Sequence, residues 1–586
     1  MEKILDFTKK HWLVIVFVLI ILGAFVLRTY NFSDWLYFKA DQVRDAKLAV
    51  SAFENGPGEL SLLGPRAAGT FLRLGPIFYY EEYISAKLFN SVEPHVFAFP
   101  DLLFSLLTIP IFFIFLRIFF SKRISILITI LYSFSFIITQ YSRFAWNPNQ
   151  IPFWGLLFSL SLLKSYKELD GKKAGWWLVL AGLSYAIVSQ LHFVAFVGFP
   201  IVAALFWVLY FPRKINWKYW VGAVATGIFI YIPVFLSDFY TSGDNLKQFI
   251  YAITAKTGDQ ALGFFETCKI IAISLFMFLT SFGHKEGVVS AWLGAFLVVA
   301  GITALIYFWK KEKKSRPFIY LVLIWFFVFI ILQIKTNISL KPRFFMPIAV
   351  LPFIFWGTTL KVVEGFGYKF LSVVAYASFI VILLMNLSGI KMWFDYLGTQ
   401  DISHVTRHIF IKQDDGKTFG QIKKAAELMA EKGRESGKRV CFYVGADYKR
   451  SYEYIFDVYY PDIEYDRMSK SIEDKEGCIY FSIATATDEA KKISNRYVDY
   501  FDFGDSYKVG TIAVWEIYPR EKFINYNEKE DKTKKSYNEE LEGIEEVDIV
   551  EEKIGIDVAE DKAEKEKTEK APARLERVLW KHIFGG

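Results

Sequence analysis

The stretch FKADQVRDAK, residues 38–47, holds two carboxylates, an arginine and two lysines, which are side chains that could do acid–base chemistry. Asp41 and Asp45 are four residues apart and Arg44 is three residues after Asp41, so a helix would place both carboxylates on one face with the guanidinium alongside. The simpler alternative is a solvated helix face with an ordinary surface ion pair, which contributes little to stability.

The residues that follow add aromatic and charged groups to the same segment. The stretch LLGPRAAGTFLRLGPIFYYEEY (62–83) contains Arg66, Tyr79 and the adjacent pair Glu81 and Glu82, set among glycines, prolines and aromatics. Charged groups of both signs and aromatic rings are therefore concentrated in one part of the chain.

A second polar stretch, QYSRFAWNPNQIPFW (140–154), follows another apolar run. Arg143 lies at the end of that run, and Asn147 and Asn149 flank Pro148. A capped helix end explains this pattern as well as a binding loop does, because proline blocks the helix and asparagine closes the turn. Both interpretations stay open at this point.

These side chains must be positioned by a membrane domain. Of the 586 residues, 53% are hydrophobic and 18% are aromatic, and the mean hydropathy of +0.28 exceeds what a soluble core requires. Many apolar runs are long enough to cross a bilayer as helices. We expect an all-α domain over residues 1–390 with about eleven transmembrane helices, near 12–29, 96–117, 124–140, 150–164, 175–191, 193–211, 219–236, 288–309, 317–334, 345–361 and 369–388.

The basic residues indicate how this domain is oriented. With the N-terminus in the cytoplasm, the Lys/Arg-rich stretches all fall on the cytoplasmic side, as the positive-inside rule requires: 121–123, 164–173, 213–218, 310–316 and 361–369. The net charge of +7 therefore reflects orientation and not a nucleic-acid partner. The outer side then carries a first loop over 30–95, and the short apolar run 270–283 is expected to be interfacial or re-entrant.

Another outer stretch, KTNISLKPRFF (335–345), is unusual because it places Lys335, Lys341 and Arg343 on the side where positive charge is disfavoured. Cations in that position suggest an anion to bind. Snorkelling toward lipid phosphates is the alternative.

The chain changes character after residue 390. KTFGQIKKAAELMAEKG (417–433) has the pattern of an amphipathic helix, and RVCFYVG, CIYFSIA and GTIAVWEIY read as strands, so we expect a small extracytoplasmic α/β domain over 391–520. Residues 521–586 form a charged tail that is expected to be disordered until a last short amphipathic piece, ARLERVLWKHIF.

The cysteines and histidines give no metal or haem motif. The three cysteines lack C-x-x-C spacing and the seven histidines lack H-x-x-x-H spacing, so no cofactor is predicted. A divalent metal stays open, because carboxylates and water bind magnesium without a motif. Cys441 and Cys478 each begin a strand-like run, so we predict that they can lie on neighbouring strands and pair.

Taken together, the chain resembles the integral-membrane glycosyltransferases of the C-fold superfamily, in the branch of the protein O-mannosyltransferases and the lipid A aminoarabinose transferase. The resemblance covers roughly residues 10–390. The motifs that carry it are FKADQVRDA, LGPIFYY, PDLLFSLLTIPIFFIFLRIFFSKR, YSRFAWNPNQIPF and SQLHF.

The resemblance implies a fold, an activity and a site. A sugar would pass, with inversion, from a polyprenyl phosphate to a hydroxyl of a lipid, glycan or protein acceptor at the outer face of the plasma membrane. Asp41 would be the general base and Asp45 the second carboxylate. The implied donor-phosphate ligands are Arg143, Lys341, Arg343 and Arg66, and the implied substrate-binding residues are Asn147, Asn149, Tyr79, Glu81 and His192.

Two positions depart from the family pattern. Mannosyltransferases of this superfamily commonly have Asp-Glu in the first loop, where this chain has Asp41-Gln42, and they tend to have an aspartate where this chain has Asn147. The sugar and the acceptor are therefore left open. A lipid-sugar flippase is the alternative function, and it would require charged residues near the midplane and repeated discontinuous helices. A non-catalytic scaffold is a third possibility, which needs fewer spans than this chain has.

Overall fold

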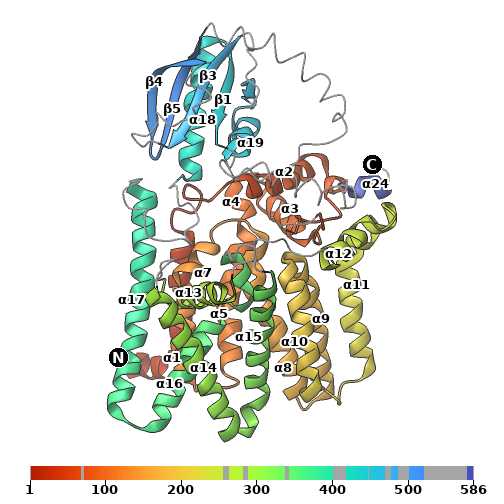
Figure 1. Ribbon diagram of the computed structural model, residues 1–586, viewed down its shortest axis with the longest axis vertical. Helices are drawn as coiled ribbons and strands as arrows, with labels where there is room; N and C mark the ends of the chain where they lie inside the picture. Colours follow the sequence, from red (N-terminus) through yellow and green to blue (C-terminus); the bar gives the residue numbers. More distant parts are fainter. Residues whose placement is uncertain are drawn as a thin grey trace.

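The computed structural model describes residues 2–67, 71–254, 263–281, 288–336, 342–399, 417–445, 448–468, 477–485, 500–520 and 577–584. Lys341, the side chain of Lys335 and most of the charged tail lie outside this description. Figure 1 shows an upright bundle of helices with a small sheet domain above one end. This is the predicted architecture of a helical membrane domain followed by an α/β domain, and the chain is an integral membrane protein.

Nine helices of the described chain are long and apolar enough to cross a membrane. Leucine, valine, isoleucine and phenylalanine side chains remain exposed on their outer surfaces, where lipid would cover them. The nine are α1 (Glu2–Thr29), α5 (Phe99–Leu116), α9 (Gly171–Leu191), α10 (Phe193–Tyr210), α11 (Trp217–Tyr240), α14 (Val288–Lys311), α15 (Arg316–Thr336), α16 (Leu351–Phe366) and α17 (Lys369–Thr399).

Two of the eleven expected spans are built from shorter helices. The expected span 150–164 is α8 (Ile151–Lys167), which has 17 residues. The expected span 124–140 is broken into α6 (Lys122–Ser133) and α7 (Phe136–Tyr141). Hydropathy predicted one continuous helix there, because it does not register where backbone hydrogen bonding is interrupted.

The break between α6 and α7 is stabilised by polar side chains from distant segments. The backbone N–H of Phe136 donates to Asn386 Oδ1 at 2.9 Å, and Asn386 Nδ2 donates to the carbonyl of Leu279 at 2.8 Å. Ser135 Oγ donates to the carbonyl of Phe278 at 2.9 Å. These bonds satisfy backbone groups that could not face lipid unpaired.

The acceptors Phe278 and Leu279 belong to α13 (Phe264–Thr280), the short segment expected to be interfacial or re-entrant. This helix is not among the nine long ones. It follows α12 (Asp244–Thr254), which contacts the outer loop through two hydrogen bonds between Asn245 and Arg73. Because α14 then runs to the opposite end of the bundle, α13 does not change the side on which later loops lie.

The basic loops gather at the end of the bundle away from the sheet domain. Lys361, at the end of α16, forms an ion pair of 3.0 Å with Glu312 from the α14–α15 connection and donates to the carbonyl of Phe119 near the start of α6. Figure 1 shows the α14–α15 and α16–α17 turns at this lower end. The one-sided distribution of lysine and arginine predicted from the sequence is therefore present in the fold.

The first outer loop folds into short elements on the upper end of the bundle (Figure 1). They are α2 (Ala40–Asn55), η1 (Pro57–Glu59), α3 (Ile77–Phe89) and α4 (Pro94–Phe97). Between η1 and α3 the chain forms a tight hairpin in which Gly64 N donates to Leu74 O at 2.7 Å. A Cβ atom on Gly64 would lie 2.0 Å from the carbonyl oxygen of Gly75, so the close approach of the two arms requires glycine.

The sheet domain has five strands in the order β2-β1-β3-β5-β4. Its elements are α18 (Phe419–Ser436), β1 (Arg439–Val444), α19 (Lys449–Tyr459), β2 (Tyr465–Arg467), β3 (Cys478–Thr485), β4 (Phe501–Val509) and β5 (Ile512–Pro519). β1 is parallel to β2 and β3, and β5 is antiparallel to β3 and β4.

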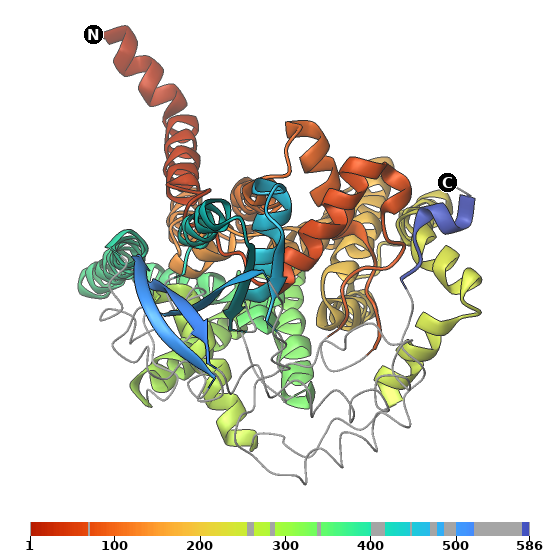
Figure 2. The same cartoon turned by 90° about the horizontal axis from the view of Figure 1, so that it is seen from above.

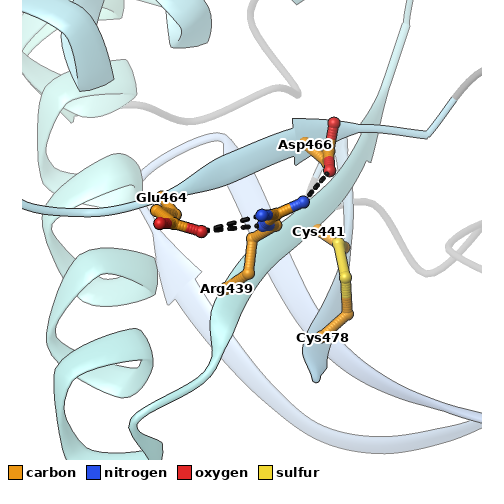
Figure 3. Close-up of a disulfide and its surroundings, with 5 residues drawn as sticks. All are labelled: Arg439, Cys441, Glu464, Asp466 and Cys478. Carbon is orange, nitrogen blue, oxygen red and sulfur yellow. Dashed lines mark hydrogen bonds and ion pairs between the residues drawn. A yellow bond between two sulfur atoms is a disulfide. The ribbon is translucent and has the colours of Figure 1, made fainter. Parts of the chain in front are cut away.

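A disulfide between Cys441 and Cys478 joins β1 and β3, which confirms the pairing predicted from the sequence (Figure 3). Beside it, Arg439 bridges Glu464 and Asp466 at 2.8 and 2.9 Å, which ties β1 to β2 and the residue before it (Figure 3). The domain is thus covalently and electrostatically connected across its parallel strands.

The sheet domain rests directly on the first outer loop. Phe419 N donates to Leu36 O at 3.1 Å, and Ser451 Oγ donates to Phe38 O at 2.8 Å. Lys47 of α2 forms an ion pair of 3.0 Å with Asp457 of α19. The α/β domain therefore holds the segment that leads into α2, and α2 carries the predicted catalytic carboxylates.

Candidate active site

The predicted helix at FKADQVRDAK is α2, and it presents Asp41 and Asp45 to one guanidinium as expected. Arg44 donates to Asp45 from Nε at 2.8 Å and from Nη2 at 3.1 Å, and to Asp41 Oδ1 from Nη1 at 3.1 Å. Gln42, which stands where the family commonly has glutamate, accepts a hydrogen bond from Lys39 N at 3.2 Å and so caps the helix.

The two aspartates differ sharply in exposure. The side chain of Asp41 is 50% exposed, whereas that of Asp45 is 1% exposed. Burial raises the pKa of Asp45, although its pairing with Arg44 opposes that rise. Tyr79 lies beside Asp45 and is also buried. Of the pair, only Asp41 is accessible to a substrate, while Asp45 holds Arg44 in place.

Arg343 approaches the same aspartate from a different part of the chain. Its guanidinium lies 5.6 Å from the ring centroid of Trp146 and 5.3 Å from that of Phe344, and its charge interacts with Asp41. The outer stretch 335–345 therefore brings one cation to the accessible carboxylate. Lys341, predicted alongside it, lies outside the described residues.

His192 lies next to Arg343, at the junction of α9 and α10. Its ring is 5.3 Å from the ring of Phe344, and its Nδ1 accepts a hydrogen bond from Val194 N at 3.2 Å. Burial and then the charge of Arg343 lower the pKa of His192 to about 3, so the imidazole is neutral at physiological pH. His192 caps α10 and lines the site as a neutral group.

A group of arginines lies near Arg44. The hairpin of the first outer loop pairs Arg66 with Arg73 in an antiparallel bridge. Burial lowers the pKa of Arg73 to about 10, and the positive charges of Arg577, Arg44 and Arg66 act in the same direction. Sequence reasoning named Arg66 but missed Arg73 and Arg577. The symmetry of LLGPR and LRLGP around the hairpin was the available signal for Arg73, and the local sequence gave none for Arg577.

Three carboxyl groups from α3 and α5 lie close together: Glu82 and Asp101 are buried, and Glu81 is partly buried. Glu81 Oε2 accepts from Gln150 Nε2 at 2.7 Å, and Asp101 Oδ2 accepts from Trp146 N at 2.9 Å. Neither carboxyl oxygen of Glu82 has a hydrogen-bond partner among the described residues. Burial raises the pKa of Glu81 to about 8, so Glu81 is mostly uncharged at neutral pH, and burial also raises the pKa of Glu82 well above its ordinary range.

The part of the chain that the structure describes has no cluster of three or more histidine, cysteine, aspartate or glutamate side chains suited to hold a metal ion.

Arg143, predicted to bind the donor phosphate, is placed elsewhere. Its Nη1 donates to the carbonyls of Leu27 and Arg28 at 3.1 and 3.0 Å, and its Nη2 donates to that of Tyr30 at 2.7 Å. These carbonyls lie at the C-terminal end of α1, where a helix leaves acceptors unpaired and where cations are favoured. The structure thus gives Arg143 a capping role and does not bring it to Asp41.

Asn147 and Asn149 also serve the loop that contains them. Asn147 Nδ2 donates to the carbonyl of Leu191, and Asn149 Nδ2 donates to that of Phe144 at 2.8 Å. Both side chains are buried. This placement matches the alternative reading of the loop as a closed helix junction, and it positions Trp146 against Arg343.

Comparison with known proteins identifies the fold. Residues 66–240 match the family described as dolichyl-phosphate-mannose-protein mannosyltransferase. The crystal structure of ArnT from Cupriavidus metallidurans bound to undecaprenyl phosphate aligns with a TM-score of 0.55 at 12% identity, covering 86% of this chain and 98% of ArnT. The chain has the C-fold of the integral-membrane glycosyltransferases. The apo crystal structure of the oligosaccharyltransferase of Archaeoglobus fulgidus aligns to this chain with a TM-score of 0.50 at 14% identity, covering 88% of this chain and 75% of the oligosaccharyltransferase. No curated protein sequence matches this chain.

The C-fold resemblance predicted from FKADQVRDA and YSRFAWNPNQIPF is therefore confirmed. The matched family region contains Arg66, Arg73 and Tyr79, whereas Asp41 and Arg343 lie outside it. The candidate site is thus assembled from the matched region, residues 66–240, and from segments that precede and follow it in the sequence.

Proposed function

We propose that the chain transfers a sugar from a polyprenyl-phosphate donor to an acceptor hydroxyl at the outer face of the membrane. The observation that carries this proposal is the exposed Asp41 carboxylate, held by Arg44 and flanked by Arg343, above a membrane-spanning bundle. The undecaprenyl phosphate bound to ArnT and the dolichyl phosphate mannose in the family description support a lipid-linked donor.

In the proposed reaction an acceptor hydroxyl attacks the anomeric carbon of the sugar and gives its proton to the Asp41 carboxylate. The bond from the anomeric carbon to the phosphate oxygen breaks with its electron pair, and polyprenyl phosphate leaves as an anion. A single displacement of this kind inverts the anomeric configuration. Arginine side chains near the leaving phosphate stabilise the charge that develops on it.

In this proposal Arg44 orients the base, Asp41. Because it bonds both aspartates, it restrains the Asp41 carboxylate, while the buried Asp45 balances its charge. Asp45 is therefore a positioning residue in this proposal. Tyr79 lies beside Asp45, and in this proposal Tyr79 and Glu81, which share helix α3, line the sugar or acceptor site.

The same proposal includes the orientation of the chain. Residues 30–95 and the sheet domain would lie outside the plasma membrane, with the basic loops in the cytoplasm. The disulfide in the sheet domain supports this, because disulfides persist in oxidising extracytoplasmic environments. The sugar, a hexose or a pentose, and the acceptor, a lipid, glycan or protein, are not specified by the residues.

The test is release of free polyprenyl phosphate by the purified chain in detergent, measured with a panel of polyprenyl-phosphate sugars and acceptors. Asp41→Asn should lower turnover about 100-fold to 10,000-fold, the usual effect of removing a general base. Asp244→Asn is the matched control, because Asp244 forms a similar exposed ion pair with Lys247 three residues on.

Two results would contradict the proposal. One is turnover by Asp41→Asn at the unmodified rate. The other is no release from any donor while the chain moves lipid-linked sugar across a vesicle membrane, which would favour the flippase.

A further inference from the structure

The C-terminal end of the chain folds back onto the first outer loop. Leu62 N donates to Val578 O at 2.9 Å, Trp580 N donates to Leu60 O at 3.1 Å, and Ser61 pairs with Leu579 in an antiparallel bridge. Residues 578–580 therefore pair with residues 60–62 of the loop through an isolated β-bridge, just before the helix that begins at Trp580. Pairing of this kind gives affinity through the main chain and places alternate side chains on opposite faces.

Side chains anchor this segment on both faces. Trp580 Nε1 donates to the Tyr80 hydroxyl at 2.8 Å, and that hydroxyl donates to Ser61 O at 3.0 Å. Lys581 forms an ion pair of 2.7 Å with Glu59, and Val578 is 2% exposed. Figures 1 and 2 show the resulting helix α24 (Trp580–Phe584) beside the outer-loop elements at the edge of the bundle.

The docked segment delivers one arginine to the site. Arg577 directly precedes the paired residues, and its charge acts on Arg73 and on Tyr79. Its Nε is buried without a hydrogen-bond partner among the described residues. Across that described part of the chain, no carboxylate forms an ion pair with Arg73 or Arg577, although Arg66 and Arg44 are also close.

Like charges gathered in a partly buried place raise the free energy of the fold unless an anion lies among them. Guanidinium groups present fixed pairs of donors that match phosphate oxygens. Arg44 is already occupied by two aspartates, so Arg73 and Arg577 are the cations with charge to offer.

We propose that Arg577, supplied by the docked segment 577–584, binds a phosphate group together with Arg73. The C-terminal segment is then part of the substrate site. The choice of phosphate rests on the proposed function, and the group could belong to the lipid-linked donor or to an anionic acceptor such as a phospholipid headgroup.

Phosphate binding is measured on the full-length chain in detergent by calorimetric titration with farnesyl phosphate and, separately, with glycerol phosphate. Arg577→Gln should weaken binding about tenfold, the effect of losing one charge-assisted interaction. Arg434→Gln is the control, because Arg434 forms an exposed ion pair with Asp462 in the sheet domain. If only the affinity for farnesyl phosphate depends on Arg577, the bound phosphate belongs to the donor. If the affinity for glycerol phosphate depends on Arg577, the bound phosphate belongs to the acceptor headgroup.

Docking is measured independently of binding. Ser61→Cys combined with Leu579→Cys, in a Cys268→Ser background, should form an oxidative cross-link in the presence of Arg577 or of glutamine at that position. Failure of the cross-link would overturn the proposal, as would equal binding of both phosphates by Arg577→Gln and the unmodified chain, or no binding by either. Binding that depends on Arg577 without any sugar transfer would instead contradict the proposed function and leave this inference standing.

Discussion

Arg44 donates two hydrogen bonds to Asp45, at 2.8 and 3.1 Å, in the bidentate geometry that arginine and carboxylate groups favour. The same guanidinium reaches Asp41 at 3.1 Å. The buried carboxylate of Asp45 thus holds the Arg44 guanidinium, and that guanidinium in turn orients the exposed carboxylate of Asp41. In the proposed reaction, this relationship assigns the role of base to the exposed Asp41 and a positioning role to the buried Asp45.

Asp45→Asn should therefore lower both stability and turnover, because the amide cannot balance the charge of Arg44. A lost hydrogen bond to a charged group costs about 1.5–3 kcal/mol, which would lower the midpoint of thermal unfolding. Turnover should fall less than with Asp41→Asn. Thermal unfolding and the donor-release assay, run on both variants, check this. An unchanged midpoint together with a loss of turnover equal to that of Asp41→Asn would show that Asp45 is itself the base.

The partly buried Glu81 predicts a pH dependence of stability. Burial raises its pKa from an ordinary value of 4.5 to about 8 in the folded chain. Between these values the unfolded chain has lost the proton that the folded chain keeps, so stability falls as pH rises from about 4.5 to about 8 and then levels off. Glu82 and Asp45, whose pKa values are also raised, act in the same direction.

Glu81→Gln should remove the share of this fall that belongs to Glu81 while keeping a group that can accept from Gln150. The measurement is the midpoint of thermal unfolding at pH 5, 7 and 9 for the variant and the unmodified chain. The difference between the two should widen in favour of the variant as pH rises. Parallel pH profiles would rule out an uncharged Glu81.

Local patterns were enough to predict the elements around the site. The charge spacing of FKADQVRDAK predicted α2 and its shared guanidinium, and the alternating runs at Cys441 and Cys478 predicted neighbouring strands and their disulfide. In each case the deciding interactions lie within one helix or between two short strands. The blocks of apolar residues likewise predicted the nine long helices.

Contacts between distant parts of the chain were beyond such patterns. Trp580 bonds Tyr80 across 500 positions, and Asn386 closes the α6–α7 break across 250. A lone asparagine in an apolar run and a basic residue in a charged tail look the same whether or not they have a partner. The capping contacts of Arg143 could not be predicted for a related reason, because a cation near a helix end suits a phosphate and a row of backbone carbonyls equally well.

Asn386 gives a prediction for the membrane domain. Asn386→Leu should destabilise the bundle, because it leaves Phe136 N–H and the carbonyl of Leu279 buried without partners, at about 1–3 kcal/mol for each group. Asn386→Asp keeps an acceptor for Phe136 N–H, so its midpoint of thermal unfolding should lie between that of the leucine variant and that of the unmodified chain. A leucine variant as stable as the unmodified chain would show that other groups satisfy the break.

Arg143 distinguishes a structural cation from a ligand-binding one. Its three hydrogen bonds to the carbonyls of Leu27, Arg28 and Tyr30 join the loop after α7 to the end of α1. Arg143→Lys keeps the charge but cannot span three carbonyls, so it should lower the midpoint of thermal unfolding and leave the affinity for farnesyl phosphate close to that of the unmodified chain. Arg73→Gln should do the reverse and weaken that affinity about tenfold, because it removes a charged donor from the arginine group. Both variants are measured by thermal unfolding and by calorimetric titration on the same preparations. Loss of farnesyl phosphate binding by Arg143→Lys at an unchanged unfolding midpoint would return Arg143 to the donor-phosphate site, where the sequence had placed it.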